Sequence, residues 1–250
     1  KLEEIFRQAT ESTIITNAHR VNNGEMPQLE PPTGAPGDFF FVEAQGPEDA
    51  VDKLTRMVRD RIPRRFGLDP RHDIQVLCPM NRGPLGAKTL NTTLQEALNP
   101  HTQSPSVERF GESFRVGDKV MQTENDYEKD VFNGDLGFIE AIDTDEEEVT
   151  IRFDSRRIAY ALGELDRISL AYAITIHKSQ GSEYPAVVMP ISTQHYPMLQ
   201  RRLLYTGITR GQRLVVLLGE RRALGIAVRG HKSLHRWTKL RERLAPNGNS

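Results

Sequence analysis

The segment "RLVVLLG" at residues 213–219 decides the fold of this 250-residue chain. It is a continuous apolar run rich in Val and Leu, and "AVVMPI" at residues 186–191 has the same character. Strands of this kind, which do not alternate between apolar and polar residues, are typically buried on both faces of a parallel sheet. We therefore predict a parallel sheet that is covered by helices on both faces.

The first hundred residues repeat this pattern. "DFFFVEA" (38–44) and "IQVLCPM" (74–80) are short apolar runs that predict strands. An amphipathic helix is expected between them, ending at Pro63, because proline interrupts helical hydrogen bonding. A second helix is expected from the four-residue spacing of Leu90, Leu94 and Leu98. Residues 1–22 predict two short helices, the second ending at Asn23-Gly24. This strand–helix alternation indicates βαβ units and an α/β fold.

The sequence between residues 105 and 165 has a different pattern of apolar and polar residues. Runs such as "FRVGDKVMQTEND" and "GDLGFIEAID" alternate and are broken by Gly and Asp, and Asn133-Gly134 predicts a tight turn. We expect a small antiparallel barrel here, with the acidic run 143–148 at a solvated hairpin tip. The predicted division of the chain is therefore an α/β domain made of 1–104 and 166–250, with an inserted barrel at 105–165.

Composition restricts the class of protein. The chain is 37% hydrophobic and 27% charged, and its net charge of −1 argues against a uniformly basic surface that coats nucleic acid. The 33 Lys and Arg residues still suffice for a local basic groove. The single cysteine, Cys78, lies in an apolar run and predicts a buried thiol in a reducing, cytoplasmic protein. No apolar run is long enough to span a membrane. The chain starts without Met and without a signal peptide, so we expect a fragment.

Three segments join a predicted strand to a helix or lie beside such a junction: "LEEIFRQA" (2–9), "TIHKSQGSEYP" (175–185) and "LLYTGITRG" (203–211). In open α/β sheets, ligands collect outside the carboxyl ends of the strands. We therefore expect five residues from these segments to converge there. They are Arg7, Gln180, Gly181, Glu183 and Arg210. The phosphate-binding pattern G-x-x-x-x-G-K-[ST] is found nowhere in the sequence.

These segments, in this order and spacing, resemble motifs IV, V and VI of superfamily 1 helicases. With "MQTENDYEKDVFNGDLG" (121–137), they are most similar to the RecD-like branch, the relatives of the exodeoxyribonuclease V alpha subunit. The resemblance extends over nearly the whole chain. It implies a second RecA-like domain with an inserted SH3-like β-barrel, and it implies that the first RecA-like domain, which carries the P-loop and the magnesium-binding acids, lies outside this sequence.

The resemblance also implies roles for individual residues. ATP with Mg²⁺ would bind in a cleft between two RecA-like domains, held mainly by the other domain. Arg210 would be the arginine finger, and Arg7 would contact the γ-phosphate from the other side. Gln180, Gly181 and Glu183 would lie near the nucleotide, with Gln180 linking it to the DNA groove. Arginine suits this task because its planar guanidinium binds phosphate in a bidentate manner and stays charged.

A second set of residues is expected to bind nucleic acid. Hydroxyl, imidazole, ammonium and amide groups satisfy phosphate oxygens without reading the bases, and a helix start after "NRGPLG" (81–86) adds backbone amides. The candidates are Asn81, Arg82, Thr175, His177, Lys178, Ser179, Asn125 and Asn133. Tyr127 is either a base-stacking residue or a half-buried aromatic of the barrel.

The resulting interpretation is the C-terminal motor domain of an ATP-dependent DNA helicase, with 5′-to-3′ polarity by resemblance and no ATPase activity on its own. Its expected partners are single-stranded DNA, an N-terminal RecA-like domain of the same protein, and RecB/RecC-type subunits. The alternative is a stand-alone nucleic-acid-binding module without a motor role. No metal site is predicted, because the seven His and one Cys show no ligand spacing. A nuclease is not predicted, because the sequence shows no cluster of acidic residues suited to a two-metal site.

Overall fold

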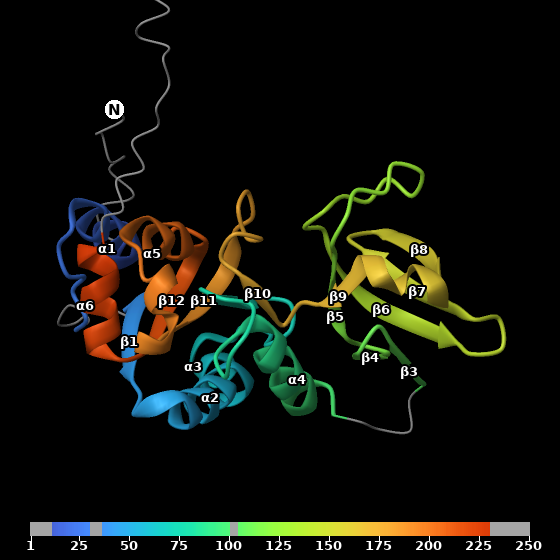
Figure 1. Cartoon of the computed structure of the whole chain (residues 1–250), viewed down its shortest axis with the longest axis horizontal. Helices are drawn as coiled ribbons and strands as arrows, with labels where there is room; N and C mark the ends of the chain where they lie inside the picture. The colour runs from blue at the N-terminus through green and yellow to red at the C-terminus, as the bar shows by residue number, and fades with distance from the viewer. Residues whose placement is uncertain (1–11, 31–36, 101–104, 231–250) are drawn as a thin grey trace, which may run out of the picture.

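The structure is a computed structural model that describes residues 12–30, 37–100 and 105–230. Figure 1 shows two parts side by side, a parallel sheet with helices on both faces and a smaller body made mostly of antiparallel strands. The chain passes into the small body after helix α4 and returns through strands β9 and β10. The small body is thus inserted into the α/β part, as the sequence pattern predicts.

The α/β part is built on five parallel strands in the spatial order β1-β12-β11-β2-β10. The two apolar runs quoted at the outset form neighbouring strands in the middle of this sheet, which confirms the predicted fold class. Strands β1 and β10 are the edge strands. The five strands are β1 (Phe39–Glu43), β12 (Gly211–Gly219), β11 (Tyr184–Ile191), β2 (Ile74–Cys78) and β10 (Ala173–Thr175).

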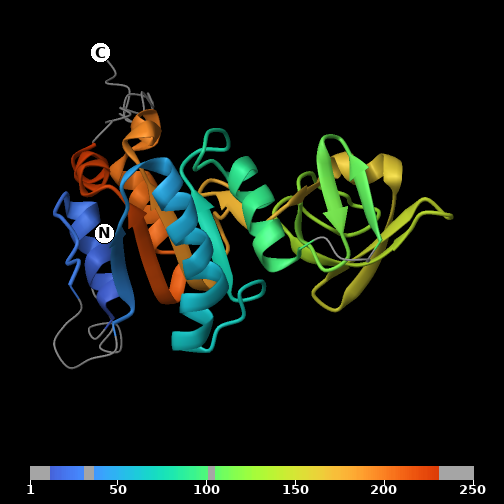
Figure 2. The same ribbon diagram turned by 90° about the horizontal axis from the view of Figure 1, so that it is seen from below.

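Side chains of β12 alternate between two apolar cores. Leu214, Val216 and Leu218 pack on one face, in the core that includes residues of α2, α3 and α4. Val215 and Leu217 pack on the other face with residues of α1, α5 and α6. Figure 2 shows the sheet between these helices. The helices are α1 (Thr13–Asn23), α2 (Gly46–Arg56), α3 (Ile62–Phe66), α4 (Ala87–Leu98), α5 (Arg201–Ile208) and α6 (Arg221–Arg229), with a 3-10 turn η3 (Thr193–Met198) before α5.

The prediction that a helix ends at Pro63 is wrong. Helix α2 runs into a π-helical turn, η1 (Met57–Arg61), and then into α3, which ends at Phe66 before Gly67. Pro63 lies in the first turn of α3, directly after the π turn, and it cannot donate the backbone hydrogen bond that another residue would make there. The π turn restarts the hydrogen-bond pattern just before the proline, so the helix continues past it.

Helix α1 confirms the second of the two predicted N-terminal helices, while residues 1–11 lie outside the described residues. Its N-terminus is bound by the Asp38 carboxylate, which accepts hydrogen bonds from the Thr13 amide (3.1 Å) and the Ser12 hydroxyl (2.7 Å). A negative charge at this end is favourable for the helix dipole. The helix ends before Gly24, whose φ of 83° is the left-handed conformation that glycine adopts at little cost.

The inserted part contains a five-stranded antiparallel sheet in the order β8-β7-β6-β5-β9, and a separate ribbon, β3-β4. Residues 143–148 form the exposed tip between β6 and β7, as expected of the acidic run. The predicted limits of the barrel remain a prediction, although β9 extends its sheet as far as Leu170. The elements are β3 (Ser106–Arg109), β4 (Glu112–Arg115), β5 (Lys119–Gln122), β6 (Leu136–Asp143), β7 (Glu148–Phe153), β8 (Arg156–Ala161), the 3-10 turn η2 (Leu162–Arg167) and β9 (Ile168–Leu170).

Within the described parts of the chain, no helix has the length and apolar character needed to cross a membrane.

Candidate functional site

Arg210 follows the C-terminus of α5 and precedes β12. Its guanidinium donates a hydrogen bond of 3.0 Å to the Ser182 carbonyl and a longer one of 3.3 Å to the Thr206 carbonyl. Its own carbonyl accepts the Tyr184 amide at 2.8 Å. Two of the three predicted motif segments therefore meet here, joined through the side chain and the backbone of one arginine.

The charge of Arg210 is not neutralised by a carboxylate among the described residues. The nearest acidic residue in the motif, Glu183, accepts instead from Gln212 at 3.1 Å. The arginine is half-buried and lies at a helix C-terminus, where the helix dipole favours a cation. The two carbonyls fix the position of the Arg210 guanidinium but do not cancel its positive charge. A guanidinium held in this way can bind an anion such as a phosphate.

The predicted location of this cluster is wrong in one respect. Tyr184 pairs with Gly211 at the amino ends of β11 and β12, so Glu183 and Arg210 lie at the amino edge of the sheet. The sequence predicted the carboxyl edge. The reason is the loop 176–183, which leaves β10 at its carboxyl end and crosses to the start of β11. Gln180 and Gly181 are exposed on this loop, and Gly181 has a φ of 91° that favours glycine. Arg7 lies outside the described residues.

A groove of about 330 Å³ opens near the carboxyl ends of β2 and β10. Three of the predicted nucleic-acid-binding residues line it, namely Asn81, Thr175 and Lys178. Asn81 follows β2, whereas Thr175 ends β10 and Lys178 follows it, so the fold brings together residues about a hundred positions apart in the sequence. Their role in binding nucleic acid stays a prediction. Lys88 also lines the groove and was missed. Lys88 comes two residues after Gly86, at the start of a predicted helix, and this position could have identified it.

Other predicted residues are not part of the groove lining. Ser179 is fully buried, and its hydroxyl donates to the Ile176 carbonyl at 2.8 Å, so it faces inward. His177 and Arg82 are exposed beside the groove residues in sequence but do not line it. The expected free amides at the start of α4 are partly used, because those of Ala87 and Lys88 donate to the Met80 and Asn81 carbonyls.

The groove wall is fixed by Asn91 of α4. Its amide nitrogen donates to the carbonyls of Leu170 and Ala173, both at 2.9 Å, and its amide oxygen accepts the Ala173 N–H at 2.7 Å. Asn91 is buried, so these bonds lock α4 against the strand that returns from the barrel. The groove also contains one carboxylate, Glu112, which accepts the Leu170 amide at 3.1 Å.

Asn125 and Asn133, the barrel candidates, lie apart from this groove, on the segment between β5 and β6. The Asn125 side-chain oxygen accepts the Asn133 amide at 2.9 Å. Two aromatic residues of the same segment are exposed, Tyr127 by 77% and Phe132 by 41%, with ring centroids 6.1 Å apart. Tyr127 is therefore not the half-buried barrel aromatic of the alternative interpretation.

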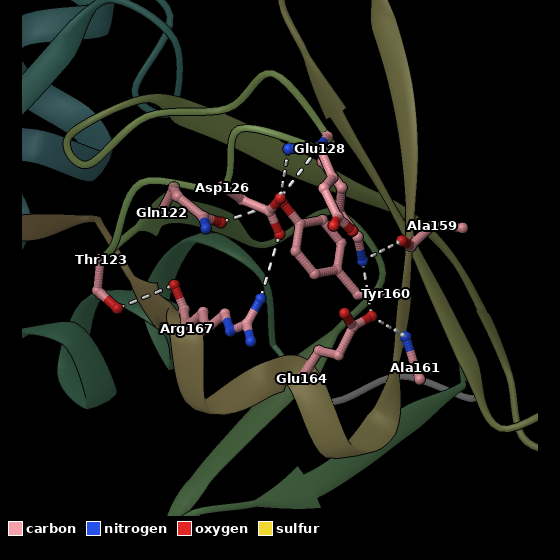
Figure 3. A network of polar contacts seen from close by, with 10 residues as sticks. Gln122, Thr123, Asp126, Glu128, Ala159, Tyr160, Ala161, Glu164 and Arg167 are labelled. Carbon is pink, nitrogen blue, oxygen red and sulfur yellow. Dashed lines mark hydrogen bonds and ion pairs between the residues drawn. The ribbon is translucent and has the colours of Figure 1, made fainter.

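Figure 3 shows what anchors this segment. The Asp126 carboxylate accepts the amides of Glu128 (3.2 Å) and Lys129 (3.0 Å) and pairs with Arg167 at 3.2 Å. These hydrogen bonds and the neighbouring cations hold the pKa of Asp126 below its usual value. Lys129 in turn binds Glu164 at 2.6 Å and lies 4.2 Å from the Tyr160 ring centroid. These interactions hold in place the segment that carries the exposed aromatic pair.

The barrel is joined to the α/β part by a buried polar cluster around Asp118. The Asp118 carboxylate is fully buried and accepts hydrogen bonds from four donors, and burial is the main cause that raises its pKa. The donors are Gln95 (2.6 Å), the Arg115 amide (2.7 Å), Asn99 (2.8 Å) and the Tyr172 hydroxyl (2.9 Å).

Lys119 lies beside this cluster and is equally enclosed. It is 2% exposed and donates to the Ile74 carbonyl at 3.3 Å. Burial lowers its pKa to about 8, against the opposing effect of Asp69 and Asp73. Asp118 and Lys119 therefore both act at the connection between barrel and sheet.

Among the described residues, no group of three or more His, Cys, Asp or Glu side chains is arranged to hold a metal ion.

Comparison with known proteins agrees with this architecture. A family model described as "ATP-dependent RecD-like DNA helicase SH3 domain" matches residues 90–153, and one described as "UvrD-like helicase C-terminal domain" matches residues 170–218. The ATP-dependent RecD2 DNA helicase of Deinococcus radiodurans is 35% identical over 98% of this chain and 32% of its own length. The RecBCD enzyme subunit RecD of Mycolicibacterium smegmatis is 30% identical over 80% of this chain and 36% of its own length. The chain thus spans about a third of these relatives.

The fold also has counterparts among solved structures. A Pif1 helicase from Bacteroides, in a crystal structure with ADP-AlF3 and single-stranded DNA, aligns over 86% of this chain and 51% of its own chain with a TM-score of 0.51 and 19% identity. A further Pif1 structure, described as concerned with unwinding of forked double-stranded DNA, aligns over 86% of this chain and 48% of its own chain with a TM-score of 0.50 and 21% identity. At these identities the likeness concerns the fold alone.

Proposed function

Because this chain is similar to RecD-like DNA helicases, we propose that it forms one half of an ATP-driven motor. In this role it donates Arg210 to a nucleotide held by a second RecA-like domain and lines part of the path of single-stranded DNA. The observation that carries the proposal is the Arg210 guanidinium, which is held by the Ser182 and Thr206 carbonyls without a carboxylate partner among the described residues.

The chemistry of phosphoryl transfer supports this role. Negative charge accumulates on the γ-phosphate oxygens in the transition state, and a guanidinium placed against them lowers the barrier. The carbonyls of Ser182 and Thr206 position Arg210 but do not neutralise it, so its charge is free for the phosphate. Gln180, Gly181 and Glu183 lie on the adjoining loop and would face the same nucleotide.

In this assignment, ATP with Mg²⁺ would be bound jointly by this chain and by the second RecA-like domain. The described residues offer a cation for the phosphates but no group of three or more His, Cys, Asp or Glu side chains that could hold the metal. The Mg²⁺ and the phosphate-binding loop would therefore come from the other RecA-like domain, where the metal would neutralise phosphate charge. On its own, this chain is not expected to hydrolyse ATP.

The groove lined by Asn81, Lys88, Thr175 and Lys178 is the proposed DNA path. Two ammonium groups, a hydroxyl and an amide suit the sugar–phosphate backbone, and they carry no base-specific pattern. The exposed pair Tyr127 and Phe132, with Asn125 and Asn133, would extend this path onto the barrel, since stacking on aromatic rings tolerates any base. RecB/RecC-type subunits and 5′-to-3′ polarity remain predictions from the family.

The arginine-finger role is tested with Arg210→Ala in a polypeptide that joins this chain to a P-loop RecA-like domain. DNA-stimulated ATP turnover should fall by about a thousandfold, because an arginine finger contributes on that order to phosphoryl transfer. Affinity for a fluorescent dT oligonucleotide should stay within about twofold, because Arg210 does not line the proposed DNA groove. Arg213→Ala, which changes an exposed arginine three residues away, is the matched control. Equal loss of turnover and DNA affinity in Arg210→Ala would contradict the finger role.

The DNA path is tested on the 250-residue chain itself. Lys88→Ala with Lys178→Ala should weaken dT binding about tenfold at low salt and reduce the slope of log affinity against log salt by about 1.4, since about 0.7 counterions are released per single-strand phosphate contact. Lys53→Ala removes a lysine of α2 that pairs with Asp49 and does not line the groove, and it should leave both values unchanged. An unaltered salt slope in the double variant would contradict this path.

A further inference from the structure

A second groove lies at the β1 edge of the parallel sheet, and its lining includes none of the residues assigned to the nucleotide or to DNA. Its volume is about 450 Å³. Its apolar lining comes from edge strand β1 and from the helices that pack on it, and includes Phe40, Val42, Met57, Ile62 and Phe66. Four strand spacings separate β1 from β10, or about 19 Å at about 4.8 Å per spacing. An occupant here would therefore leave the proposed DNA groove uncovered.

The rim of this groove carries three exposed arginines, Arg61, Arg64 and Arg65. Their i, i+3, i+4 spacing places them on one helix face, and none of them pairs with a carboxylate among the described residues. Arg59 of the same segment differs, because it is bound to Asp60 at 2.9 Å. Like charges on one helix face repel each other. Asp60, whose pKa is lowered mainly by its hydrogen bond to Arg59 and also by Arg64, is a single carboxylate beside these cations, so the rim keeps a net positive charge that favours an anion.

The floor of this groove is formed by two aromatic rings, those of Phe40 and Phe66, which a further side chain could contact. Phe40 and Phe66 meet edge to face with ring centroids 6.2 Å apart. The Arg65 guanidinium lies 5.4 Å from the Phe40 centroid and 5.6 Å from that of Phe66. Both rings are only half-buried. An incoming apolar side chain would cover the exposed parts of these rings next to a cation.

The backbone around the groove adds two further features. Strand β1 pairs with β12 and with no other described strand, so its outer edge can accept an extended segment. Met57 and Arg61, the two ends of the π-helical turn η1, both line the groove. Turns of this kind occur frequently at functional sites.

We propose that this groove is a docking site for an extended acidic peptide segment of a partner protein, with one aromatic or large aliphatic side chain among its carboxylates. The carboxylates would pair with Arg61, Arg64 and Arg65, and the apolar side chain would pack against the exposed parts of Phe40 and Phe66. Charge complementarity selects a polyanion, and the half-buried apolar floor favours one that carries an apolar side chain among its charges, as an acidic peptide does.

The test uses the whole 250-residue chain and a fluorescein-labelled ten-residue peptide in which aspartates flank a central phenylalanine. Fluorescence anisotropy should show saturable binding that weakens as salt rises. A peptide with asparagines in place of the aspartates, and one with serine in place of the phenylalanine, should each bind at least about tenfold more weakly, a ratio that corresponds to about 1.4 kcal/mol.

Arg64→Ala with Arg65→Ala should weaken binding of the acidic peptide about tenfold or more, while Arg59→Ala should change it by less than about twofold. All three arginines are exposed, so both variants should fold. Absence of binding, equal affinity in the two variants, or displacement of the peptide by a dT oligonucleotide with affinity that depends on Arg64 and Arg65 would each overturn the proposal. The last outcome would assign the groove to nucleic acid.

Discussion

The parallel sheet is enclosed by apolar side chains on both faces, whereas the junction between this sheet and the barrel is built from buried polar and charged side chains. In the sheet, Leu217 is fully buried among aliphatic neighbours, with no directional bonds. At the junction, Asp118 is equally buried but binds four donors. Apolar packing stabilises in proportion to the area removed from water, and it constrains orientation weakly. Hydrogen bonds to a buried carboxylate constrain direction, so the junction sets how the barrel is held against the sheet.

The largest expected effect is at the junction. Asp118→Ala removes the acceptor of four neutral donors, of which Gln95 and Tyr172 are buried. We expect a loss of about 4 kcal/mol in the free energy of unfolding, since each buried donor left without a partner costs about 1–3 kcal/mol. Chemical denaturation at neutral pH measures this loss. The control is Asp145→Ala at the exposed hairpin tip, which should change stability by less than about 0.5 kcal/mol. A loss below about 1 kcal/mol for Asp118→Ala would show that the junction does not depend on this carboxylate.

The matching change in the sheet is Leu217→Ala. It removes apolar contacts and leaves a cavity between β12 and the helices on its face, so we expect a loss of about 3 kcal/mol. The same denaturation experiment applies, with the half-buried Leu203 changed to Ala as a control of smaller effect. If Leu203→Ala cost as much as Leu217→Ala, the sheet core would not be the main apolar contribution in this part of the molecule.

The two regions should also differ in their response to pH. The pKa of Lys119 is lowered to about 8 in the folded protein from 10.5. Between these two values the unfolded chain binds the lysine proton and the folded chain does not, so stability should increase as pH rises from about 8 to about 10.5. The contribution is roughly 3 kcal/mol, from about 1.4 kcal/mol per pKa unit.

Urea denaturation at several pH values tests this difference. The Lys119→Met profile should lack the rise seen in the unsubstituted protein, whereas Leu217→Ala should shift the whole profile downward and keep its slope. A rise of equal size in Lys119→Met would assign the pH dependence to other groups.

The same contrast explains what the sequence could predict. Strands β11 and β12 were recognisable because burial on both faces of a parallel sheet demands an uninterrupted apolar run, a local property. The junction was not recognisable. In "VGDKV" (116–120), Asp118 has the appearance of a turn residue, and its partners Gln95 and Tyr172 are 23 and 54 positions away. A polar residue reveals such a role only when its distant partners are placed beside it.

The candidate site also combines features that the sequence could predict with features that it could not. The proximity of "HKSQGSE" and "TGITRG" followed from their positions next to strands, and Arg210 does contact Ser182. The edge of the sheet at which they meet was mispredicted, because it depends on the path of loop 176–183, which composition does not determine. Ser179 was placed among the groove residues for its hydroxyl, but the turn directs that hydroxyl to the Ile176 carbonyl. Residue type suggested the chemistry, and the backbone path decided which side chains are accessible.

The smallest expected effect lies inside the barrel, where one hydrogen bond connects two buried side chains. The Tyr160 hydroxyl donates to the Gln122 side-chain oxygen at 3.0 Å, as Figure 3 shows, and the Gln122 side-chain nitrogen has no partner among the described residues. Tyr160→Phe keeps the ring and leaves this oxygen unpaired, so we expect a loss of about 1 kcal/mol.

Thermal unfolding of Tyr160→Phe, with the exposed Tyr196 changed to Phe as a matched control, measures this difference. Adding Gln122→Leu should recover part of the loss, because replacing both partners of a buried hydrogen bond by apolar groups of similar shape is nearly neutral. A double variant that is less stable than Tyr160→Phe alone would mean that Gln122 has a further role in the barrel. In that case the polar character of the junction would extend into the barrel core.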